Sequence, residues 1–139
     1  MNRTVGNWMT RGLRSAAPGD PLFRGLELMA EQGIRHVLVL EDDELRGIVS
    51  NRDVVRSTAK NPEGRLDLHG CTMEEVMTPI PLQTARPDET LGAAAGRMHQ
   101  HRISALPVIE DGAVTGLLTT DDILAAVSLG DRVPLRPDL

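Results

Sequence analysis

The sequence predicts an α/β fold of the α+β type, made of two tandem copies of one strand-helix-strand-strand-helix unit. The chain repeats itself, because residues 47–53 (Gly-Ile-Val-Ser-Asn-Arg-Asp) return as residues 116–122 (Gly-Leu-Leu-Thr-Thr-Asp-Asp). Apolar residues match at the same offset outside these heptads, as Leu22 matches Leu91 and Met29 matches Met98. A shared spacing over so many positions is typical of a duplicated folding unit.

A helix is expected early in each copy. Asp20 followed by Pro21 predicts a helix start with Asp20 as the N-cap, and Gly33 ends this helix after apolar residues at helical spacing. In the second copy, Asp88 takes the place of the N-cap. A short strand is expected just before each helix, at residues 13–15 and 82–84.

A β-hairpin and a second helix complete each copy. Each hairpin consists of two short apolar runs around a polar turn, at residues 37–40 with 45–49 and at residues 105–109 with 114–118. The heptads end these hairpins, so Ser50 and Thr119 are each expected to open a helix directly after a strand.

The order of these elements divides the chain into repeats and connections. The predicted parts are a first repeat with its lead-in at residues 1–59, a linker at 60–71, a second repeat at 72–130 and a mobile tail at 131–139. The linker is polar and contains proline and glycine. Thr72 and Glu75 have the spacing of a capping box, which predicts a short helix at the start of the second repeat.

Composition excludes several classes of protein. The chain has 139 residues, of which 40% are hydrophobic and 25% charged, as in ordinary globular domains. No apolar run reaches membrane-spanning length and the N-terminus lacks an apolar signal segment, so we expect a cytoplasmic protein with no membrane partner. A net charge of −5, with Trp8 and Phe23 as the only aromatic residues, argues against nucleic-acid binding.

Catalytic and metal motifs are not visible in the sequence. There is no nucleophile–base pair, ligand cluster or phosphate loop of the Walker type, so we do not expect an enzyme. His99 and His101 are two apart on a predicted helix and point in different directions, which makes a poor metal pair. Cys71 is the only cysteine, and an incidental linker thiol is the simpler interpretation beside a redox role.

The repeated heptad places a hydroxyl and a carboxylate at the mouth of a helix. Backbone N–H groups there suit phosphate, the hydroxyl of Ser50 or Thr119 can add a donor, and the carboxylate of Asp53 or Asp122 can accept two hydrogen bonds from a ribose diol. The same spacing also fits a capping box that merely starts a helix. Recurrence in a duplicated unit, each time after a similar hairpin, favours a binding site.

This pattern resembles a tandem pair of cystathionine-β-synthase domains, known as a CBS pair or Bateman module, over nearly the whole chain. The residues that carry the resemblance are the Met-Thr before each repeat, residues 34–39 and 103–108, and both heptads. The resemblance implies two repeats packed sheet against sheet with pseudo-twofold symmetry. It also implies two clefts that bind adenosine nucleotides such as AMP, ADP or ATP.

The resemblance implies one group of site residues for each cleft. Three residues of the first heptad would share a cleft with second-repeat residues: Ser50, Arg52 and Asp53 with Ile80, Ser104 and Ala105. Two residues of the second heptad would share the other cleft with first-repeat residues: Thr119 and Asp122 with Thr10, Leu13, Ile34, Arg35 and His36.

The two predicted clefts differ in charge. Arg52 precedes Asp53, whereas Asp121 precedes Asp122, so an anionic ligand is expected to prefer the first cleft. The alternative is that both Arg52 and Asp121 point to solvent. His36 could meet phosphate, and a hydrogen-bonded structural histidine is equally compatible.

A regulatory ligand-binding module is the function that these features favour. It would sense an adenosine nucleotide and act on another protein, which the sequence does not identify. The alternative is a structural or protein-interaction module without a bound nucleotide. We also expect a homodimer, because Ala93–Ala95 and the pair Val54 and Val55 give small apolar helix surfaces beyond what one sheet covers.

Overall fold

The computed structural model describes residues 3–61, 63, 65 and 67–130, and it divides into two compact units. One unit, here called the Asp53 unit, comprises residues 14–82. The other, the Asp122 unit, comprises residues 1–13 together with residues 83–139. Each unit therefore takes a lead-in segment from the sequence that precedes the other unit. The predicted tail at residues 131–139 lies outside the described residues.

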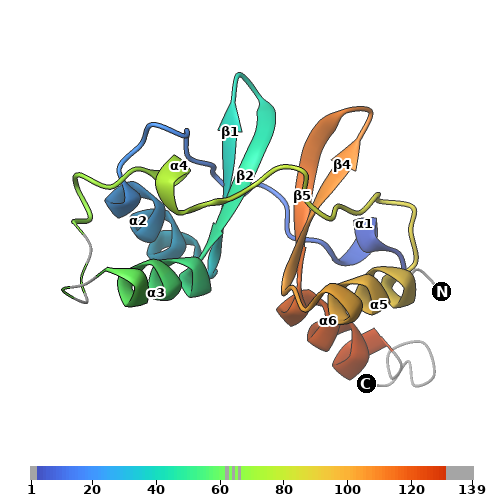
Figure 1. Cartoon of the computed structure of the whole chain (residues 1–139). Helices are drawn as coiled ribbons and strands as arrows, with labels where there is room; N and C mark the ends of the chain where they lie inside the picture. The colour runs from blue at the N-terminus through green and yellow to red at the C-terminus, as the bar shows by residue number, and fades with distance from the viewer. Residues whose placement is uncertain (1–2, 62, 64, 66, 131–139) are drawn as a thin grey trace. The chain divides into compact units, whose positions relative to one another are not determined.

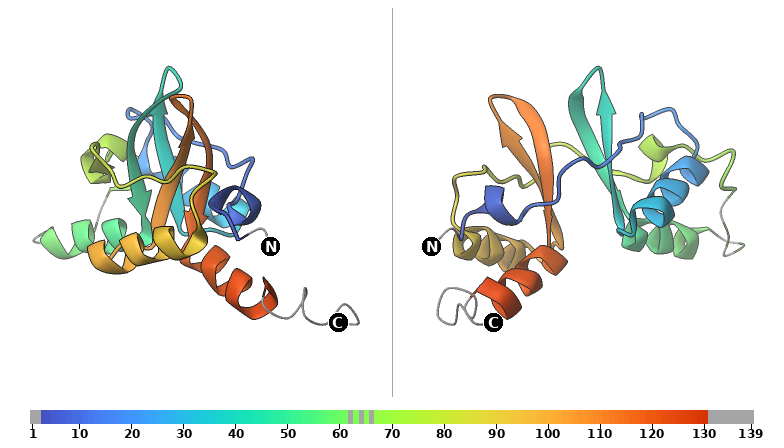
Figure 2. Two further views of the ribbon diagram at one scale, coloured as in Figure 1. Left: turned by 90° about the vertical axis from the view of Figure 1, so that its right-hand side faces the viewer. Right: turned by 180° about the vertical axis from the view of Figure 1, so that it is seen from behind.

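The Asp53 unit contains a hairpin with helices at one end (Figures 1 and 2). Its elements are α2 (Leu22–Gln32), β1 (His36–Glu41), β2 (Glu44–Ser50), α3 (Asn51–Lys60), α4 (Met73–Val76) and β3 (Thr78–Pro79). The strands form an antiparallel sheet in the order β1-β2-β3. The register pairs His36 with Ser50, so the first residue of β1 faces the last residue of β2.

The Asp122 unit repeats this plan (Figures 1 and 2). Its elements are α1 (Val5–Trp8), α5 (Leu91–His101), β4 (Ala105–Glu110), β5 (Ala113–Thr119), α6 (Thr120–Ala125) and the π-helical turn η1 (Ala126–Gly130). Strands β4 and β5 are antiparallel, with Ala105 paired to Thr119. Both predicted hairpins and all the predicted helices are thereby confirmed in type and approximate position.

Each unit has its own core of buried aliphatic side chains. In the Asp53 unit this core includes Leu22, Leu28, Val39 and Met73, and in the Asp122 unit it includes Val5, Leu91, Met98, Leu106 and Leu118. The short lead-in helices contribute Val5 and Met73, which are fully buried. Burial of such side chains stabilises each unit by roughly 1.5–3 kcal/mol per residue.

The predicted N-caps of the first helices are wrong. Helix α2 has Pro21 as its N-cap, because the Asp20 carboxylate accepts a hydrogen bond from the Ala17 amide at 2.9 Å instead. Helix α5 begins after Thr90, whose hydroxyl accepts from the Ala93 amide at 3.1 Å. The Asp88 carboxylate is engaged by Arg86 at 2.8 Å. In both cases the carboxylate binds a neighbouring group and therefore does not cap the helix.

The short strands predicted at residues 13–15 and 82–84 do not form. In their place are single parallel bridges, from Ala16 to Val39 and from Ala85 to Val108. A turn follows each bridge at once, because the Asp20 amide donates to the Ala17 carbonyl and the Glu89 amide donates to the Arg86 carbonyl. The chain therefore leaves the sheet after one residue.

Part of the predicted linker packs on the Asp53 unit. The Phe23 amide donates to the Leu68 carbonyl and the Leu22 amide donates to the Cys71 carbonyl, at 2.9 and 2.7 Å. Leu68 and Cys71 also pack against the core of this unit. Leu68 and Cys71 of the predicted linker are thus bound to helix α2. The predicted division into repeats stays a prediction. No described helix is long and apolar enough to cross a membrane.

Candidate hydroxyl–carboxylate sites

The first heptad brings Ser50 and Asp53 together at the start of α3. The Ser50 amide and hydroxyl both donate to Asp53 Oδ2, at 2.8 and 3.0 Å, and the Asp53 amide donates to Ser50 Oγ at 3.1 Å. This is a complete capping box. The Asp53 residue is only 8% exposed and is the one buried charged residue among those described.

The second heptad builds the same arrangement at the start of α6. The Thr119 amide and hydroxyl donate to Asp122 Oδ2 at 2.9 and 3.2 Å, and the Asp122 amide donates back to the Thr119 hydroxyl at 3.4 Å. Asp122 is half-buried. The capping-box interpretation of both heptads is therefore realised, and any ligand must bind to carboxylates that already serve as helix caps.

A threonine from a lead-in segment reaches each carboxylate. The Thr10 hydroxyl donates to Asp122, at 3.1 Å to Oδ1 and 3.3 Å to Oδ2. The Thr78 hydroxyl donates to Asp53 Oδ1 at 3.4 Å. The family resemblance implied Thr10 beside Asp122, whereas Thr78 was not among the predicted site residues. The Met-Thr pairs 9–10 and 77–78 carry the signal, although they are offset by 68 residues and not by the 69 of the heptads.

The glycine of each heptad gives the lead-in segment its room. A Cβ at Gly47 would lie 2.6 Å from the Thr78 carbonyl oxygen and 2.6 Å from Met77 Sδ. A Cβ at Gly116 would lie 2.9 Å from the Thr10 carbonyl oxygen and 2.7 Å from Met9 Sδ. The heptad and the Met-Thr pair are thus parts of one packed arrangement.

Positive charge gathers near Asp53. Arg56 lies 3.4 Å from Asp53 Oδ1 through Nη1, and its own side chain is 55% exposed. The preceding Arg52 is exposed, as is Asp121 beside the second motif. At the position that matches Arg56, the Asp122 unit has Ala125, which offers no charge. The two carboxylates therefore differ in their charged neighbours.

His36 lies beside the first motif in its own unit. Cross-strand partners such as His36 and Ser50 project to the same face of a sheet. Burial lowers the pKa of His36; the Asp53 carboxylate opposes this, while Arg35 and Arg52 lower it further. The Asn51 amide donates to the Arg35 carbonyl, which fixes the start of β1 against α3. The imidazole is thereby electrostatically coupled to Asp53.

The remaining predicted site residues lie in both units. In the Asp53 unit, the Ile80 amide donates to the Arg46 carbonyl and the residue is 46% exposed, while Ile34 is half-buried. In the Asp122 unit, Leu13 is half-buried, the Ser104 carbonyl accepts from the Thr120 amide, and Ala105 pairs with Thr119. The predicted association of Ser104 and Ala105 with Asp53, and of Leu13 and residues 34–36 with Asp122, stays a prediction.

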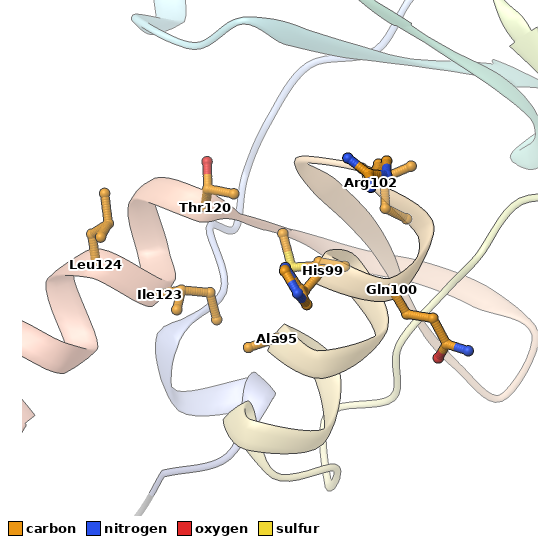
Figure 3. A pocket seen from close by; sticks show the side chains of 9 residues that line it. Ala95, His99, Gln100, Arg102, Thr120, Ile123 and Leu124 are labelled. Carbon is orange, nitrogen blue, oxygen red and sulfur yellow. The ribbon is translucent and has the colours of Figure 1, made fainter.

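A cavity of about 590 Å³ lies between α5 and α6, and neither Asp53 nor Asp122 lines it (Figure 3). Its walls are Ala95, Met98, His99, Gln100, Arg102, Ile103, Thr120, Ile123 and Leu124. None of the predicted site residues lines it. Its walls combine apolar side chains with the polar groups of His99, Gln100 and Arg102.

The described residues contain no group of three or more His, Cys, Asp or Glu side chains that could hold a metal ion. Burial raises the pKa of the Cys71 thiol, and Glu75 and Asp67 raise it further. The reactive thiolate is therefore less populated at neutral pH than in a free cysteine. These surroundings disfavour the redox interpretation of Cys71.

Comparison with known families decides what the duplicated unit is. The model of the CBS domain matches residues 5–60 and again residues 73–129. The chain belongs to the CBS-domain family. It contains two such domains and is a CBS pair, a type of regulatory module.

Solved structures show the same fold over nearly the whole chain. A protein with CBS domains from Burkholderia ambifaria is 27% identical, with a TM-score of 0.80 over 93% of this chain and 96% of that one. The CBS pair of protein MJ0100, solved with 5′-methylthioadenosine and S-adenosyl-L-methionine, is 25% identical, with a TM-score of 0.78 over 89% of this chain and 98% of that one. Both predictions from the sequence, the family and the α/β fold of two CBS repeats, are confirmed.

Among curated proteins, homoserine O-acetyltransferase of Methanohalophilus mahii is 32% identical over 93% of this chain. The chain spans only 25% of the length of that relative. The match thus concerns a CBS-pair portion, and the acetyltransferase name describes the whole of a much longer protein.

Proposed function

We propose that this CBS pair binds an adenosine nucleotide such as AMP, ADP or ATP, or a related adenosyl compound, and that occupancy regulates another protein. The observation that carries the proposal is the fixed carboxylate in each unit. Asp53 and Asp122 are each held by a capping box through Oδ2, and each receives a threonine hydroxyl on Oδ1. A carboxylate has about four acceptor positions, so Asp122 keeps one for a ribose hydroxyl beside its three protein donors, and at Asp53 a ribose hydroxyl replaces the 3.4 Å contact from Arg56.

The ligands of the MJ0100 CBS pair support the carboxylate as the main contact. S-adenosyl-L-methionine and 5′-methylthioadenosine share an adenosine with a 2′,3′-diol, and neither carries phosphate. The diol and the base are therefore the features common to these ligands. In our proposal Asp53 and Asp122 take the diol, and the predicted neighbours Ile80, Ile34 and Ala105 offer aliphatic surface to the base.

The hydroxyls of the heptads have a smaller part in the proposal. The Ser50 hydroxyl already donates its one proton to Asp53 Oδ2, and Thr119 does the same to Asp122. A phosphate oxygen can receive that proton only if the hydroxyl turns away from the carboxylate. In the Asp53 unit, Arg52 and Arg56 provide positive charge for phosphate.

A second candidate is an interaction module without nucleotide. The complete capping boxes favour it, because they account for Ser50, Asp53, Thr119 and Asp122 without any ligand. The two candidates differ in one measurable property. A ligand present at a hundred times its dissociation constant adds about 2.7 kcal/mol to the free energy of unfolding, whereas an interaction module shows no such gain.

Calorimetric titration tests the proposal. We expect AMP, ADP, ATP, S-adenosyl-L-methionine or 5′-methylthioadenosine to bind, and the 2′-deoxy form of the preferred ligand to bind more weakly. Asp53→Ala and Asp122→Ala are each expected to weaken binding at one site only, by about 1.5–3 kcal/mol, or about 10- to 150-fold. Glu110→Ala, at an exposed acid outside both heptads, is the matched control. No binding by any of these compounds would leave the interaction module as the function.

We propose that a second copy of the chain packs against the cavity between α5 and α6 and forms a homodimer. Leu124 lines the cavity and is 64% exposed, and Val127 and Leu129 in the following η1 are 56% and 47% exposed. Exposed apolar side chains that gather on one surface are typical of association sites. Ala94 is fully buried, so it cannot contribute to the surface expected from the sequence. Analytical ultracentrifugation is expected to show a dimer that Leu124→Glu dissociates. A monomeric wild-type chain at micromolar concentration contradicts this proposal.

A further inference from the structure

We propose that Thr10 and Thr78 are positioning residues for nucleoside recognition, each holding the carboxylate that accepts the ribose diol. Thr10 acts on Asp122 and Thr78 acts on Asp53. The inference rests on the proposed function and goes beyond it, because the hydroxyl of each threonine acts through the aspartate and not on the ligand.

Each threonine is held in place by backbone pairing to the strand that precedes the heptad helix. The Thr10 amide donates to the Leu117 carbonyl at 2.8 Å, and the Leu117 amide donates back to the Thr10 carbonyl at 3.0 Å. Thr78 pairs with Ile48 in the register of β2 and β3. The adjacent Met9 is buried over Gly116, which keeps the segment close to β5. The hydroxyl is thus presented to the carboxylate by ordered backbone.

The carboxylate needs this contact for its orientation. The capping box engages Oδ2 alone, through the amide and hydroxyl of Thr119 in one unit and of Ser50 in the other. Rotation about the Cβ–Cγ bond of an aspartate is soft and moves both oxygens together, so a contact to Oδ1 adds to the restraint that the capping box places on Oδ2. Thr10 engages Asp122 Oδ1 at 3.1 Å and thereby holds the carboxylate at a second point. A fixed acceptor binds a diol without a further ordering cost.

The two units depend on this contact to different degrees. The Thr10 hydroxyl lies 3.1 and 3.3 Å from the two oxygens of Asp122. The Asp122 unit has no arginine to add to this contact, because Ala125 stands at the position that matches Arg56. The Thr78 hydroxyl lies 3.4 Å from Asp53 Oδ1, and Arg56 approaches the same oxygen. Asp53 therefore has a second group that limits its rotation, and Thr10 is expected to matter more than Thr78.

The test compares adenosine with 2′-deoxyadenosine in calorimetric titrations of the full chain. Thr10→Val and Thr78→Val keep the shape of the side chain and remove the hydroxyl. We expect each to weaken adenosine binding at its own site about fivefold, the worth of one hydrogen bond of about 1 kcal/mol. Binding of 2′-deoxyadenosine is expected to change less, so the ribose preference falls. Thr10→Ser and Thr78→Ser restore both.

Matched controls are Thr115→Val and Thr58→Val, whose hydroxyls donate to backbone carbonyls in the same units. If a valine variant fails to fold, the serine and alanine variants at the same position give the comparison. Equal weakening of both nucleosides marks a merely structural threonine and overturns the inference, as does an unchanged ribose preference. A wild-type chain that binds neither nucleoside, or both equally, overturns the diol contact of the proposed function as well.

Discussion

The Asp53 unit and the Asp122 unit have the same backbone plan and different electrostatics. Both place a serine or threonine and an aspartate at the end of a hairpin, and both receive a threonine from a lead-in segment. Positions 36, 52 and 56 are His, Arg and Arg in one unit, and the matching positions 105, 121 and 125 are Ala, Asp and Ala in the other. The shared residues build the fold and the carboxylate site, whereas the differing ones set its charge.

The largest expected difference concerns the heptad glycines. Gly47→Ala forces a Cβ to 2.6 Å from a backbone oxygen, and Gly116→Ala to 2.9 Å, while the nearby methionine sulfurs can move aside. We expect both to lower the free energy of unfolding by about 1–3 kcal/mol, with the greater loss at Gly47. Urea unfolding checks this order.

Gly92 and Gly96 in α5 provide the controls for these variants. No atom would lie within 4 Å of a Cβ at either position. Alanine there is expected to stabilise the helix by up to about 1 kcal/mol. Equal, small effects of all four substitutions would show that the lead-in segments do not press on the heptads.

The next largest expected effect on stability concerns the half-buried ion pair of Glu89 and Arg97 in the Asp122 unit. Burial acts to raise the pKa of Glu89, but hydrogen bonds from Arg97 and the Arg86 amide, together with their charges, hold it below its ordinary 4.5. Its contribution is therefore complete above pH 4.5 and is lost as the pH falls through the lowered pKa. Glu89→Gln is expected to cost about 1 kcal/mol at pH 7 and less in acid, measured by urea unfolding.

The matching positions of the Asp53 unit show why this effect belongs to one unit only. Asp20 stands where Glu89 would be and fully buried Leu28 stands where Arg97 would be. Glu110→Gln, at an exposed acid of the Asp122 unit, is the control and should show no such dependence on pH. The pair has no role in stability if Glu89→Gln and Glu110→Gln behave alike.

His36 is expected to give the Asp53 unit a response at higher pH. Its pKa is lowered from 6.5, mainly by burial, so the folded chain binds fewer protons than the unfolded chain below that pH. The free energy of unfolding should then decrease as the pH falls from 6.5 through the lowered pKa. The Asp53 carboxylate opposes the burial and reduces this effect. His36→Gln removes it and His101→Gln, at an exposed site, does not. A wild-type stability that is flat from pH 7.5 to 5 argues against this coupling.

The sequence predicted most of this architecture from local pattern. Each hairpin was predicted from two apolar runs that are separated by a polar turn. The capping boxes were predicted from Ser50, Thr72 and Thr119, each with an acid three residues later. The N-caps at Asp20 and Asp88 were wrong because nearby groups, the Ala17 amide and Arg86, bind those acids first. Such competition between neighbours is not visible in spacing.

The candidate site was predicted in part. The contact of Thr10 with Asp122, which spans 112 positions, was expected from the family resemblance. Thr78 was missed because it lies in a two-residue strand, which shows no periodicity in the sequence. The division into units was missed because residues 1–13 precede the Asp53 unit in sequence but belong to the Asp122 unit. Long-range packing, and not local propensity, decides both.

The smallest expected effect tests the difference in charge directly. Arg52 and Asp121 are both exposed, so each changes ligand affinity by less than about 1 kcal/mol, or about fivefold. Because ATP carries more negative charge than AMP, Arg52→Ala is expected to lower the ATP-to-AMP affinity ratio at the Asp53 site. Asp121→Ala should raise that ratio at the Asp122 site.

Salt separates this charge effect from a change of shape. Interactions of exposed charges are screened over about 10 Å at 0.1 M ionic strength, so the ratio at the Asp53 site should converge on that of Arg52→Ala as salt increases. Calorimetric titration of chains that also carry Asp122→Ala reports on the Asp53 site. Titration of chains that carry Asp53→Ala reports on the Asp122 site. If Arg52→Ala retains the wild-type ratio at low salt, Arg52 faces solvent, and Arg56, which lies 3.4 Å from Asp53, is then the cation to substitute.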